Sequence, residues 1–372
     1  MSKLSHSKLV GGATRGSAPE PLGDPVAAPD PLPERHERRE AAPTRPSGGE
    51  LAETARAAGL RRVAMVAWRD LHDAEAGGSE LHAHEIARRW AAAGVEVMLR
   101  TSKVRGAPRR LERDGYLVDR HRGRYGIFAS APLGLRRRDP DALVEIWNGM
   151  PFFSPLWFGG RRAVFLHHVH AEMWDMVLPP GLARAGRWIE AVAAPPIYRS
   201  SPVVTLSESS KTEIVELLGL RPERVFVVPP GIDGRFSPGG LRADHPLVVA
   251  VGRLVPVKRL ERLVGAAAAL RPRHPGLEVV IAGEGYERGA LEGAIAAAGL
   301  RGVVRLAGRV DDDALVDLYR RAWVLASTSV REGWGMTITE AAACGTPAVA
   351  SRIAGHLDAV SGEGGILFDS DA

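Results

Sequence analysis

The chain has 372 residues and a formal net charge of +5, with 45% hydrophobic and only 6% aromatic residues. This length exceeds one ordinary core and predicts about two domains, and the composition is typical of a soluble α/β protein. No apolar run is long enough for a membrane span or a signal peptide, and the single cysteine, Cys344, permits neither an internal disulfide nor a cysteine metal cage. We therefore expect a cytoplasmic protein.

The chain opens with residues 1–57, which are rich in proline, charge and small side chains. They show no sustained apolar period, which predicts a disordered extension. Alternating apolar strands and amphipathic helices follow and define a first domain over residues 58–235. Its expected strands are "RRVAMVAW", "VEVMLR", "ALVEIW", "RAVFLH", "PVVTLS" and "RVFVVP", and its clearest helices are "SELHAHEIARRWAAAG" and "SESSKTEIVELLG".

Basic residues crowd residues 100–138 of this first domain. We favour a solvated arginine-rich surface, and the alternative is a basic face that meets an anionic acceptor or the inner face of an anionic membrane. No aromatic residues interleave with these charges, so we do not expect nucleic acid as a partner. The residues concerned are Arg100, Lys103, Arg105, Arg109, Arg110, Arg113, Arg120, Arg122, Arg124 and Arg136 to Arg138.

Glycine and proline dominate residues 229–246, which form the best linker of the chain and separate a second domain over residues 236–372. Two consecutive alternating series predict two parallel sheets, each covered by helices on both faces. Ligands of such sheets bind at the carboxyl ends of the strands, so the following loops should carry function. In the second domain the expected strands are "LVVAVGR", "LEVVIAG", "VVRLAGR", "WVLAST" and "PAVAS".

Two cations follow the first strand of the second domain in "VGRLVPVKRL". Arg253 leaves the strand end and Lys258 opens the next helix, so both can converge on one diphosphate. The structural alternative is a helix-capping arginine beside a solvated lysine. A lysine in a first helical turn opposes the helix dipole, which mildly disfavours that alternative.

The stretch "REGWGMTITEAAACGTP" places two glutamates at a strand end and in the following helix. Gly333 and Gly335 allow a ligand to approach the backbone, and the helix start offers free N–H groups to an anion. Glu332 would lie on the loop, whereas Glu340 would lie about one turn into the helix. As an isolated pair, the acids could equally be solvated surface residues.

Two further strand ends of this domain carry candidate ligand contacts. Gly283 and Glu284 belong to a glycine turn in "AGEGYE", while Arg309 and Val310 could turn backbone groups toward a base. The acid pair Asp311 and Asp313 has spacing that could hold Mg²⁺, but helix capping accounts for it better. No phosphate-binding P-loop is present.

In the first domain, Gly77 and Gly78 stand at a helix entrance where the backbone could approach a phosphate. A strand then ends in His167, His168 and His170, which raises a zinc hypothesis. No further ligand stands at zinc-finger spacing, so we expect no metal and interpret the histidines as a polar lining, with one of them contacting a ligand.

Taken in order, these segments resemble the family 4 glycosyltransferases of the GT-B fold, which pair two Rossmann-like domains across a central crevice and retain anomeric configuration. The resemblance covers roughly residues 62–368. It is carried by "WRDLHDAEAGGSELHAHEIARRWAAAGVEV", "GIDGRFSP", "VGRLVPVKRLERLV", "AGEGYE", "LAGRVDDDALVDLYRRAWVLASTS" and above all "EGWGMTITEAAACGTPAVAS".

The resemblance implies a donor, a nucleotide diphosphate sugar, and a role for each candidate residue. Arg253 and Lys258 would clamp the diphosphate, Glu332 would bind the transferred hexose, and Glu340 would receive the ribose hydroxyls. His167 or His168 would face the reacting centre, without a metal or cofactor. The other implied donor contacts are Gly77, Gly78, Gly283, Glu284, Arg309, Val310, Gly333, Trp334, Gly335, Met336 and Thr337.

Two other functions stay open at this stage. One is a nucleotide-sugar epimerase of the same fold, which would need no acceptor. The other is a sugar-nucleotide binding protein without turnover, because family members usually continue through further helices and we expect the second domain to be truncated at its end. The acceptor could be a glycan, a lipid or a small molecule.

Overall fold

The structure is a computed structural model that describes residues 48–73, 75–133, 135, 138–360 and 364–369. Residues 46–372 group into one compact unit, and the two sheets of the protein both lie within it. Most of the extension expected to be disordered, residues 1–47, lies outside the described residues.

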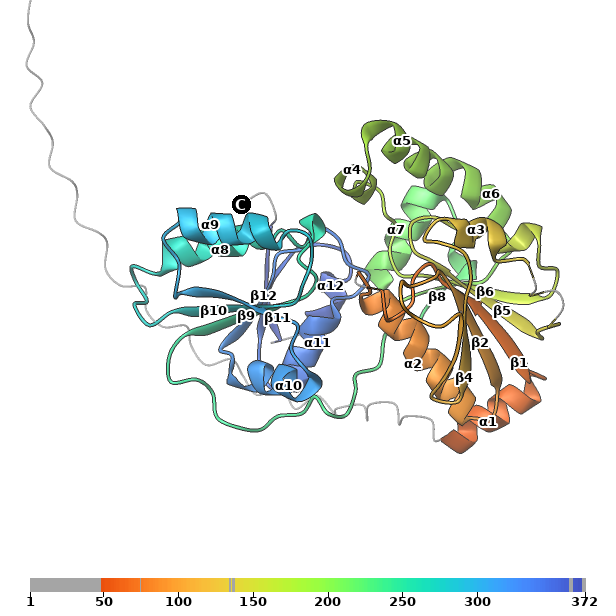
Figure 1. Cartoon of the computed structure of the whole chain (residues 1–372), viewed down its shortest axis with the longest axis horizontal. Helices are drawn as coiled ribbons and strands as arrows, with labels where there is room; N and C mark the ends of the chain where they lie inside the picture. The colour runs from red at the N-terminus through yellow and green to blue at the C-terminus, as the bar shows by residue number, and fades with distance from the viewer. Residues whose placement is uncertain (1–47, 74, 134, 136–137, 361–363, 370–372) are drawn as a thin grey trace, which may run out of the picture. The chain divides into compact units, whose positions relative to one another are not determined.

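The first sheet has eight strands in the order β3-β4-β2-β1-β5-β6-β7-β8 (Figure 1). Neighbouring strands are parallel except β3 and β4, which form an antiparallel pair. The strands are β1 (Arg62–Val66), β2 (Glu96–Thr101), β3 (Arg110–Arg113), β4 (Tyr116–Arg120), β5 (Ala142–Trp147), β6 (Arg161–Leu166), β7 (Val203–Thr205) and β8 (Val225–Val227).

Burial on both faces of β1 explains why helices cover both sides of this sheet. Val63 and Met65 belong to one core cluster, while Ala64 and Val66 belong to another, because successive side chains of a strand point to opposite faces. The helical segments of this half are α1 (Gly48–Ala57), α2 (Gly78–Ala92), α3 (Gly126–Ser130), α4 (Met173–Val177), α5 (Pro180–Trp188), a π-helical turn (Ile189–Ala193), α6 (Ala194–Tyr198) and α7 (Glu208–Leu218), with short 3-10 turns at Ser154–Leu156 and Pro222–Arg224.

The second sheet has six parallel strands in the order β11-β10-β9-β12-β13-β14. Its strands are β9 (Leu247–Val251), β10 (Glu278–Ala282), β11 (Val304–Gly308), β12 (Val324–Ser327), β13 (Ala348–Ser351) and β14 (Gly365–Phe368). Its helical segments are a 3-10 turn (Pro256–Lys258), α8 (Leu260–Leu270), α9 (Arg288–Ala297), α10 (Asp312–Arg321), α11 (Met336–Ala343) and α12 (His356–Ala359).

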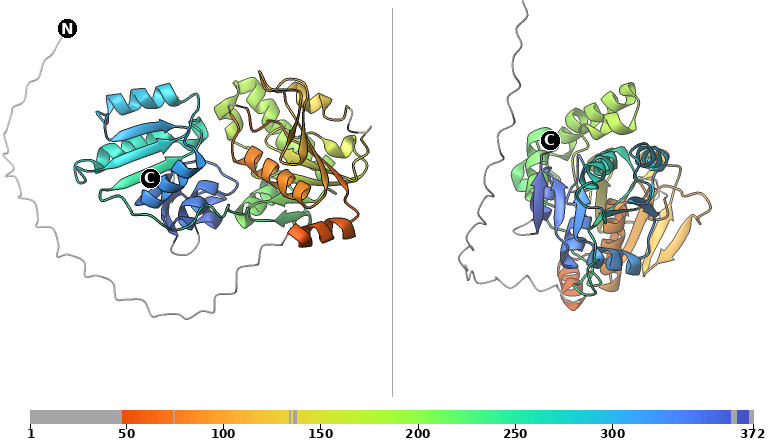
Figure 2. Two further views of the ribbon diagram at one scale, coloured as in Figure 1. Left: turned by 60° about the horizontal axis from the view of Figure 1, so that its bottom comes forward. Right: turned by 90° about the vertical axis from the view of Figure 1, so that its left-hand side faces the viewer.

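Helices α8 and α9 cover one face of the second sheet, and α10 and α11 cover the other, as the three views of the ribbon show (Figures 1 and 2). The cores agree with this layering: Leu263 and Leu291 pack in one cluster, while Val316 and Ile338 pack in the other. Both expected parallel α/β domains are therefore present, and the carboxyl ends of their strands carry the predicted loops.

The structure corrects the C-terminal boundary of the segment predicted to be disordered. Residues 48–57 form the helix α1 rather than part of a disordered extension. Ala55 of α1 is buried in the same cluster as Val63 and Met65, with Leu60 packed against it. The segment is stabilised by this docking, which its own alanine-rich sequence does not show.

The Arg-rich region is not a uniformly solvated surface either. Arg100 donates to Asp119 over 2.7 Å and Arg120 donates to Asp70 over 2.9 Å, and all four side chains are buried. Removing these charges from water is compensated only by such pairing. Arg136 and Arg137 lie outside the described residues.

None of the described helices is long and apolar enough to cross a membrane.

A matched pair of glycines tests the packing of the second sheet. Gly283 follows β10 with φ +143°, and an added Cβ would collide with the carbonyl oxygen of Gly252. We expect Gly283→Ala to lower the free energy of unfolding by about 3 kcal/mol or more, because the new side chain meets rigid backbone in a strained conformation. Urea denaturation monitored by circular dichroism measures the loss.

Gly293→Ala is the control for that substitution. Gly293 lies in α9, and an added Cβ there meets no atom within 4 Å. Alanine should raise the unfolding free energy by about 0.5–1 kcal/mol, since it is the better helix former. Equal effects at the two positions would contradict the packing described for Gly283.

Candidate functional site

Three glycines line the carboxyl ends of adjacent strands in the second sheet. Gly252, Gly283 and Gly308 follow or end β9, β10 and β11 and have φ values of +154°, +143° and +73°. The N–H of Gly283 donates to the carbonyl of Gly308 over 2.7 Å. Without side chains, this rim exposes backbone at the edge where parallel sheets bind ligands.

Lys258 and Glu332 form an ion pair beside this rim. Lys258 ends the 3-10 turn Pro256–Lys258, two residues before α8, and so does not open that helix as expected. Ser329 Oγ also donates to the carboxylate of Glu332, over 2.8 Å. The sequence predicted that Lys258 and Arg253 converge on one ligand; the structure pairs Lys258 with Glu332 of the loop after β12.

Glu332 is held in its ionised form. Burial pushes the pKa of its carboxyl upward, but the charge of Lys258, with His356 and Ser329, outweighs burial and lowers the pKa to about 2. A carboxylate with so low a pKa accepts hydrogen bonds at neutral pH and does not donate a proton.

Arg253 reaches from the end of β9 to the loop that follows β1. Its Nη1 donates to the carbonyl of Glu75 over 3.0 Å. A Cβ added at Gly77 would lie 2.9 Å from the Nε of Arg253, so this loop approaches the guanidinium closely only because residue 77 is glycine. The sequence predicted that the backbone at Gly77 approaches a phosphate. In this structure the neighbour of Gly77 is the guanidinium of Arg253. Gly78 begins α2, and an added Cβ there meets nothing within 4 Å.

Glu80 and Arg69 fix the same loop. Glu80 accepts from the N–H of Gly77 over 2.8 Å and from Arg69 over 3.2 Å, and both side chains are buried. The bond from the N-cap N–H to a glutamate at the third helical position is one half of a capping box, because the N-cap Gly77 has no side chain to form the other half. Arg69 gave no sequence signal, because its partner lies 11 positions away.

The turn before α11 is held by hydroxyl groups from the first domain. Ser207 and Ser210 donate to the carbonyl of Gly333 over 3.2 and 3.1 Å. A Cβ added at Gly333 would collide with the carbonyl oxygen of His167. These serines stand at the start of α7, in a stretch that we interpreted only as a helix.

Helix α11 begins with its backbone groups turned toward this turn. Gly335 precedes it with φ +103°, and within the described residues no side chain caps the helix. Met336 and Thr337 form its first turn. Trp334 instead anchors the turn, because its Nε1 lies 3.4 Å from Thr339 Oγ1 and its ring packs against a core cluster. The start of α11 therefore fits the predicted anion-binding helix terminus.

Glu340 occupies a different environment from Glu332. Tyr319 of α10 donates to one of its carboxylate oxygens over 2.9 Å. Burial raises the pKa of Glu340 above its ordinary value, although the bond from Tyr319 acts in the opposite direction. The two glutamates are therefore not equivalent: Lys258 neutralises Glu332, and a phenol binds Glu340.

The other expected contacts lie on the remaining strand ends of the second sheet. Glu284 pairs with Arg288 of α9 at 2.9 Å. Arg309 and Val310 directly follow β11. Asp311 then accepts from the N–H of Ala314 over 2.8 Å, which confirms that this acid caps α10.

The histidines after β6 form a polar cluster in which His167 and His170 are buried and His168 is half-buried. His167 Nε2 lies 3.0 Å from His82 Nδ1 of α2, and His168 stacks on His170 with ring centroids 5.1 Å apart. Burial lowers the pKa of His168 to about 4, despite the opposing charge of Glu332. Within the described residues, no group of three or more His, Cys, Asp or Glu side chains is placed to hold a metal ion.

Arg331 and Asp358 are further residues that the sequence did not reveal. Arg331 joins the loop after β12 to Glu172 at 2.9 Å and to Glu213 of α7 at 2.7 Å. Asp358 of α12 accepts from the N–H groups of Glu208 and Ser209, over 3.2 and 3.3 Å. Each partner lies more than 100 positions away, so spacing could not predict these contacts.

Family models match both halves of the chain. The model described as Glycosyltransferase Family 4 matches residues 76–235, and the model described as Glycosyl transferases group 1 matches residues 235–372. The D-inositol 3-phosphate glycosyltransferase of Kineococcus radiotolerans is 30% identical over 339 residues, which cover 78% of this chain and 76% of that protein. The chain belongs to the family 4 glycosyltransferases.

Another relative and two solved structures resemble this glycosyltransferase along most of its length. The D-inositol 3-phosphate glycosyltransferase of Acidothermus cellulolyticus is 29% identical and covers 83% of this chain and 79% of its own. Sucrose-phosphate synthase from Thermosynechococcus elongatus has a TM-score of 0.72 at 19% identity, covering 84% and 86%. The Anabaena protein HepE, in complex with UDP-glucose, has a TM-score of 0.63 at 17% identity, covering 83% and 85%. These structures confirm the GT-B fold of the glycosyltransferase.

His168 makes the stability of the glycosyltransferase depend on pH. Its folded pKa is about 4, whereas an unfolded histidine titrates near 6.5. Between these values the unfolded chain binds a proton that the folded chain does not, so stability falls as pH falls. On going from pH 7 to pH 5, this one group should remove on the order of 2 kcal/mol from the unfolding free energy.

Urea denaturation at pH 7 and pH 5 measures this contribution. The His168→Gln variant should lose less stability between the two pH values than the wild type, by that amount. His274→Gln, at an exposed position of the second domain, is the control and should behave as the wild type does. Equal losses in the wild type and His168→Gln would contradict the low pKa of His168.

Proposed function

We propose that this glycosyltransferase moves a hexosyl group from a nucleotide diphosphate sugar to an acceptor hydroxyl, with retention of anomeric configuration and without a metal ion. The observation that carries the proposal is that Lys258 pairs with Glu332, that the charge of Glu332 also acts on Arg253, and that the loop of Glu332 leads into the uncapped start of α11. Three sources of positive potential at one place fit a diphosphate.

The diphosphate would lie against two different kinds of cation. Arg253 presents a planar fork that matches two phosphate oxygens, and Lys258 supplies a point charge. Lys258 already shares its charge with Glu332, so a bound phosphate would compete for the same ammonium group. The N–H groups of Met336 and Thr337 at the start of α11 add donors that need no side chain.

The nucleoside would extend along the glycine rim toward α11. Glu340 gives one carboxylate oxygen to Tyr319, and we assign the other to the ribose hydroxyls. Backbone groups of Arg309 and Val310 would face the base, while Gly283 and Glu284 would support the nucleotide from the neighbouring strand end. Glu332 would accept hydrogen bonds from hydroxyls of the hexose, which suits its ionised state.

The chemistry follows from where charge develops. Breaking the bond between the anomeric carbon and the phosphate oxygen leaves negative charge on the diphosphate, so fixed cations stabilise the transition state more than the ground state. The acceptor hydroxyl forms the new bond on the same face, and its proton passes to the leaving phosphate oxygen. His167 lies next to Gly333 and the charge of Glu332 acts on His168, which supports assigning one of these histidines to the reacting centre.

The names of the relatives direct the choice of substrates. Both relatives described above are D-inositol 3-phosphate glycosyltransferases, so we propose a phosphorylated polyol as the acceptor. HepE is a protein crystallised with UDP-glucose, which makes UDP-glucose the first donor to test.

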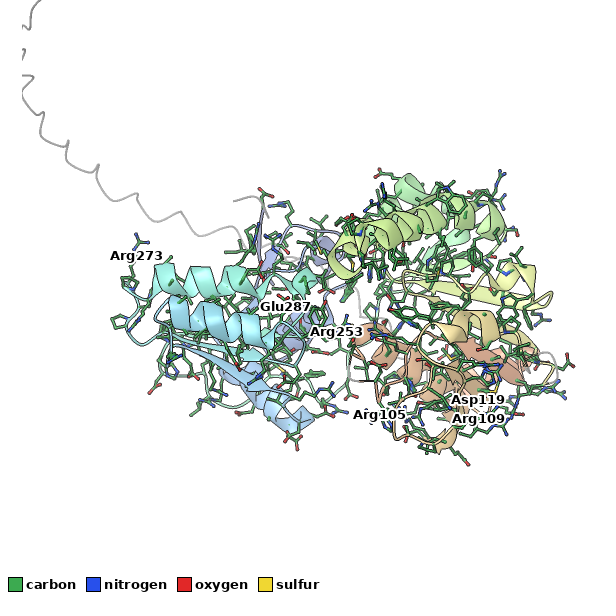
Figure 3. All side chains as sticks on the ribbon, turned by 45° about the horizontal axis from the view of Figure 1, so that its top comes forward. Arg105, Arg109, Asp119, Arg253, Arg273 and Glu287 are labelled. Carbon is green, nitrogen blue, oxygen red and sulfur yellow. The ribbon has the colours of Figure 1, made fainter. Side chains whose placement is uncertain are left out.

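Lys258→Ala and Glu332→Gln test the assigned site. Each variant should lower kcat/KM for nucleoside diphosphate release by about 100-fold or more, by analogy with the loss of one preorganised oxyanion donor. Coupled detection of the released nucleoside diphosphate measures the rate. Arg273→Ala is the control, because Arg273 is exposed at the opposite end of α8 from Arg253 (Figure 3) and should leave the rate unchanged. Full activity in both site variants would refute the assignment.

A panel of UDP-, GDP- and ADP-sugars tests the donor. The true donor at 100 times its dissociation constant should stabilise the fold by about 2.7 kcal/mol, which a thermal-shift experiment detects. The donor should then be turned over with D-inositol 3-phosphate in the presence of EDTA. A requirement for Mg²⁺ would contradict the metal-free mechanism, and turnover without any acceptor would indicate an epimerase instead.

A further inference from the structure

A basic pocket lies in the first domain, away from the residues assigned above. Its volume is about 220 Å³, and every lining residue is a lysine, an arginine or a histidine. The lining consists of Lys103, Arg109, Arg120, His121 and Arg122. Lys103, Arg109 and Arg122 are exposed, so their charged ends are available to an anion at this hollow.

The backbone builds this pocket at the carboxyl ends of two strands. Thr101 ends β2 and pairs in register with Arg120, which ends β4. The N–H of His121 donates to Thr101 over 2.8 Å, and the N–H of Lys103 donates to the carbonyl of Arg122 over 2.8 Å. Three basic side chains are thus held at one sheet edge by main-chain bonds rather than by mobile loops.

Arg109 completes the wall from the segment that enters β3. Its carbonyl accepts from the N–H of Arg120 over 2.7 Å. Arg109 directly precedes β3, whose first residue, Arg110, pairs in register with Asp119 of β4; Arg105, Arg109 and Asp119 are labelled in Figure 3. The pocket therefore draws on β2, β4 and the chain before β3, all at one end of the sheet.

The charge of the pocket is not balanced by the protein. Arg120 is neutralised by Asp70 at 2.9 Å. In contrast, among the residues that the structure describes, no carboxylate lies within 4.0 Å of the charged groups of Lys103, Arg109 or Arg122. Holding like charges together costs free energy, which an anion between them would recover.

The lowered pKa of His121 is a second sign that positive charge exceeds negative charge at the pocket. Burial, followed by the charges of Arg100 and Arg109, lowers its pKa below the ordinary histidine value. Its Nδ1 is buried and has no hydrogen-bond partner within the described chain. Buried polar atoms in native proteins nearly always have a partner, so this unpaired nitrogen is consistent with a site that a polar group completes.

The backbone at Arg122 is strained in a way that serves the pocket. Its φ is +61°, a left-handed conformation that a non-glycine residue adopts only at a cost of about 1–2 kcal/mol. This conformation directs its carbonyl to the N–H of Lys103. Strain of this kind collects at sites where a side chain must be placed.

Arg120 links the pocket to the donor side. Its Nη2 donates to Asp70 and lies 3.3 Å from His72 Nδ1, both in the loop after β1. Farther along that loop, the carbonyl of Glu75 accepts from Arg253. Arg120 of the basic pocket and Arg253 of the assigned diphosphate clamp therefore bind the same loop, at Asp70 and at Glu75.

We propose that this pocket binds a phosphate monoester group of the acceptor and so selects acceptors that carry one. The inference rests on the proposed function only in naming the bound molecule as an acceptor. A phosphate monoester offers three oxygens, which the arginine forks and the lysine can bind together. An uncharged polyol of the same shape would leave three cations unbalanced.

Isothermal titration with the full chain tests the pocket without requiring turnover. The probes are inorganic phosphate, D-inositol 3-phosphate and unphosphorylated inositol. We expect the two phosphates to bind and inositol to bind at least tenfold more weakly, since a hydrogen bond to a charged group contributes about 1.5–3 kcal/mol. Arg109→Gln and Lys103→Gln should each weaken binding of D-inositol 3-phosphate by about tenfold.

Arg105→Gln is the matched control, because Arg105 is exposed in the same segment but does not line the pocket. It removes the same charge and should leave binding unchanged. Equal effects of Arg105→Gln and Arg109→Gln would reduce the pocket to general surface charge and overturn the proposal. So would equal affinity for D-inositol 3-phosphate and inositol.

Vesicles distinguish a soluble phosphate from a lipid headgroup. Vesicles of phosphatidic acid, whose headgroup is a phosphate monoester, and phosphatidylcholine, mixed 1 to 3 in about 0.15 M salt, are compared with pure phosphatidylcholine by sedimentation. Binding to the soluble phosphates that depends on Arg109 supports a soluble acceptor. Binding to anionic vesicles alone, lost in Arg109→Gln, would overturn the soluble acceptor and place a lipid phosphate in the pocket.

The same titrations separate this inference from the proposed function. Arg109→Gln should bind the nucleotide donor as the wild type does, while Lys258→Ala should keep its affinity for D-inositol 3-phosphate. Phosphate binding that depends on Arg109 in a chain without transferase activity would refute the proposed function and leave the pocket standing. Transfer at equal KM to phosphorylated and unphosphorylated acceptors would refute the role of the pocket and leave the proposed function standing.

Discussion

The ion pair between Lys258 and Glu332 organises the strand ends of the second sheet. It joins the turn that precedes α8 to the loop that follows β12, and two neighbouring bonds repeat the connection. Thr328 donates to the carbonyl of Lys258 over 2.7 Å, and the N–H of Val330 donates to Val257 over 2.9 Å. Glu332 is thereby held in place and kept ionised by the protein itself.

Backbone contact is the second constraint, and it explains where the glycines stand. Gly77 meets a guanidinium, Gly283 and Gly333 meet carbonyl groups, and none of these positions leaves room for a Cβ. At these glycines the backbone therefore packs directly against other polar groups, without an intervening side chain. The family resemblance predicted these glycines as ligand contacts, and the structure adds that they are needed for the protein to pack on itself.

The sequence predicted the features that depend on local periodicity or on a motif. Both sheets, the strand-end loops and the cap at Asp311 followed from hydrophobic patterning and turn chemistry. The hairpin of β3 and β4 was missed, although its turn residues Asp114 and Gly115 are a recognised hairpin signal and both have positive φ. The arginine-rich composition drew attention to charge instead.

Contacts between distant segments could not be predicted in this way. Arg331 lies 159 positions from Glu172, and the serines that hold Gly333 lie more than 120 positions from it. The buried pairs of Arg100 and Arg120 show the same limit, since a charged residue is interpreted as exposed until its partner is known. The basic pocket also needed the register of β2 and β4, because its lining is scattered over 20 positions of chain.

The cap that Asp358 places on α7 has a mechanical consequence. Ser207 already caps this helix by accepting from the N–H of Ser210 over 3.0 Å, so Asp358 is a second, removable cap supplied by α12. Losing a surface cap costs about 1 kcal/mol, which is close to thermal energy. Two caps from different elements thus share the start of α7, so the helix keeps a cap of its own even where the bonds from Asp358 are lost.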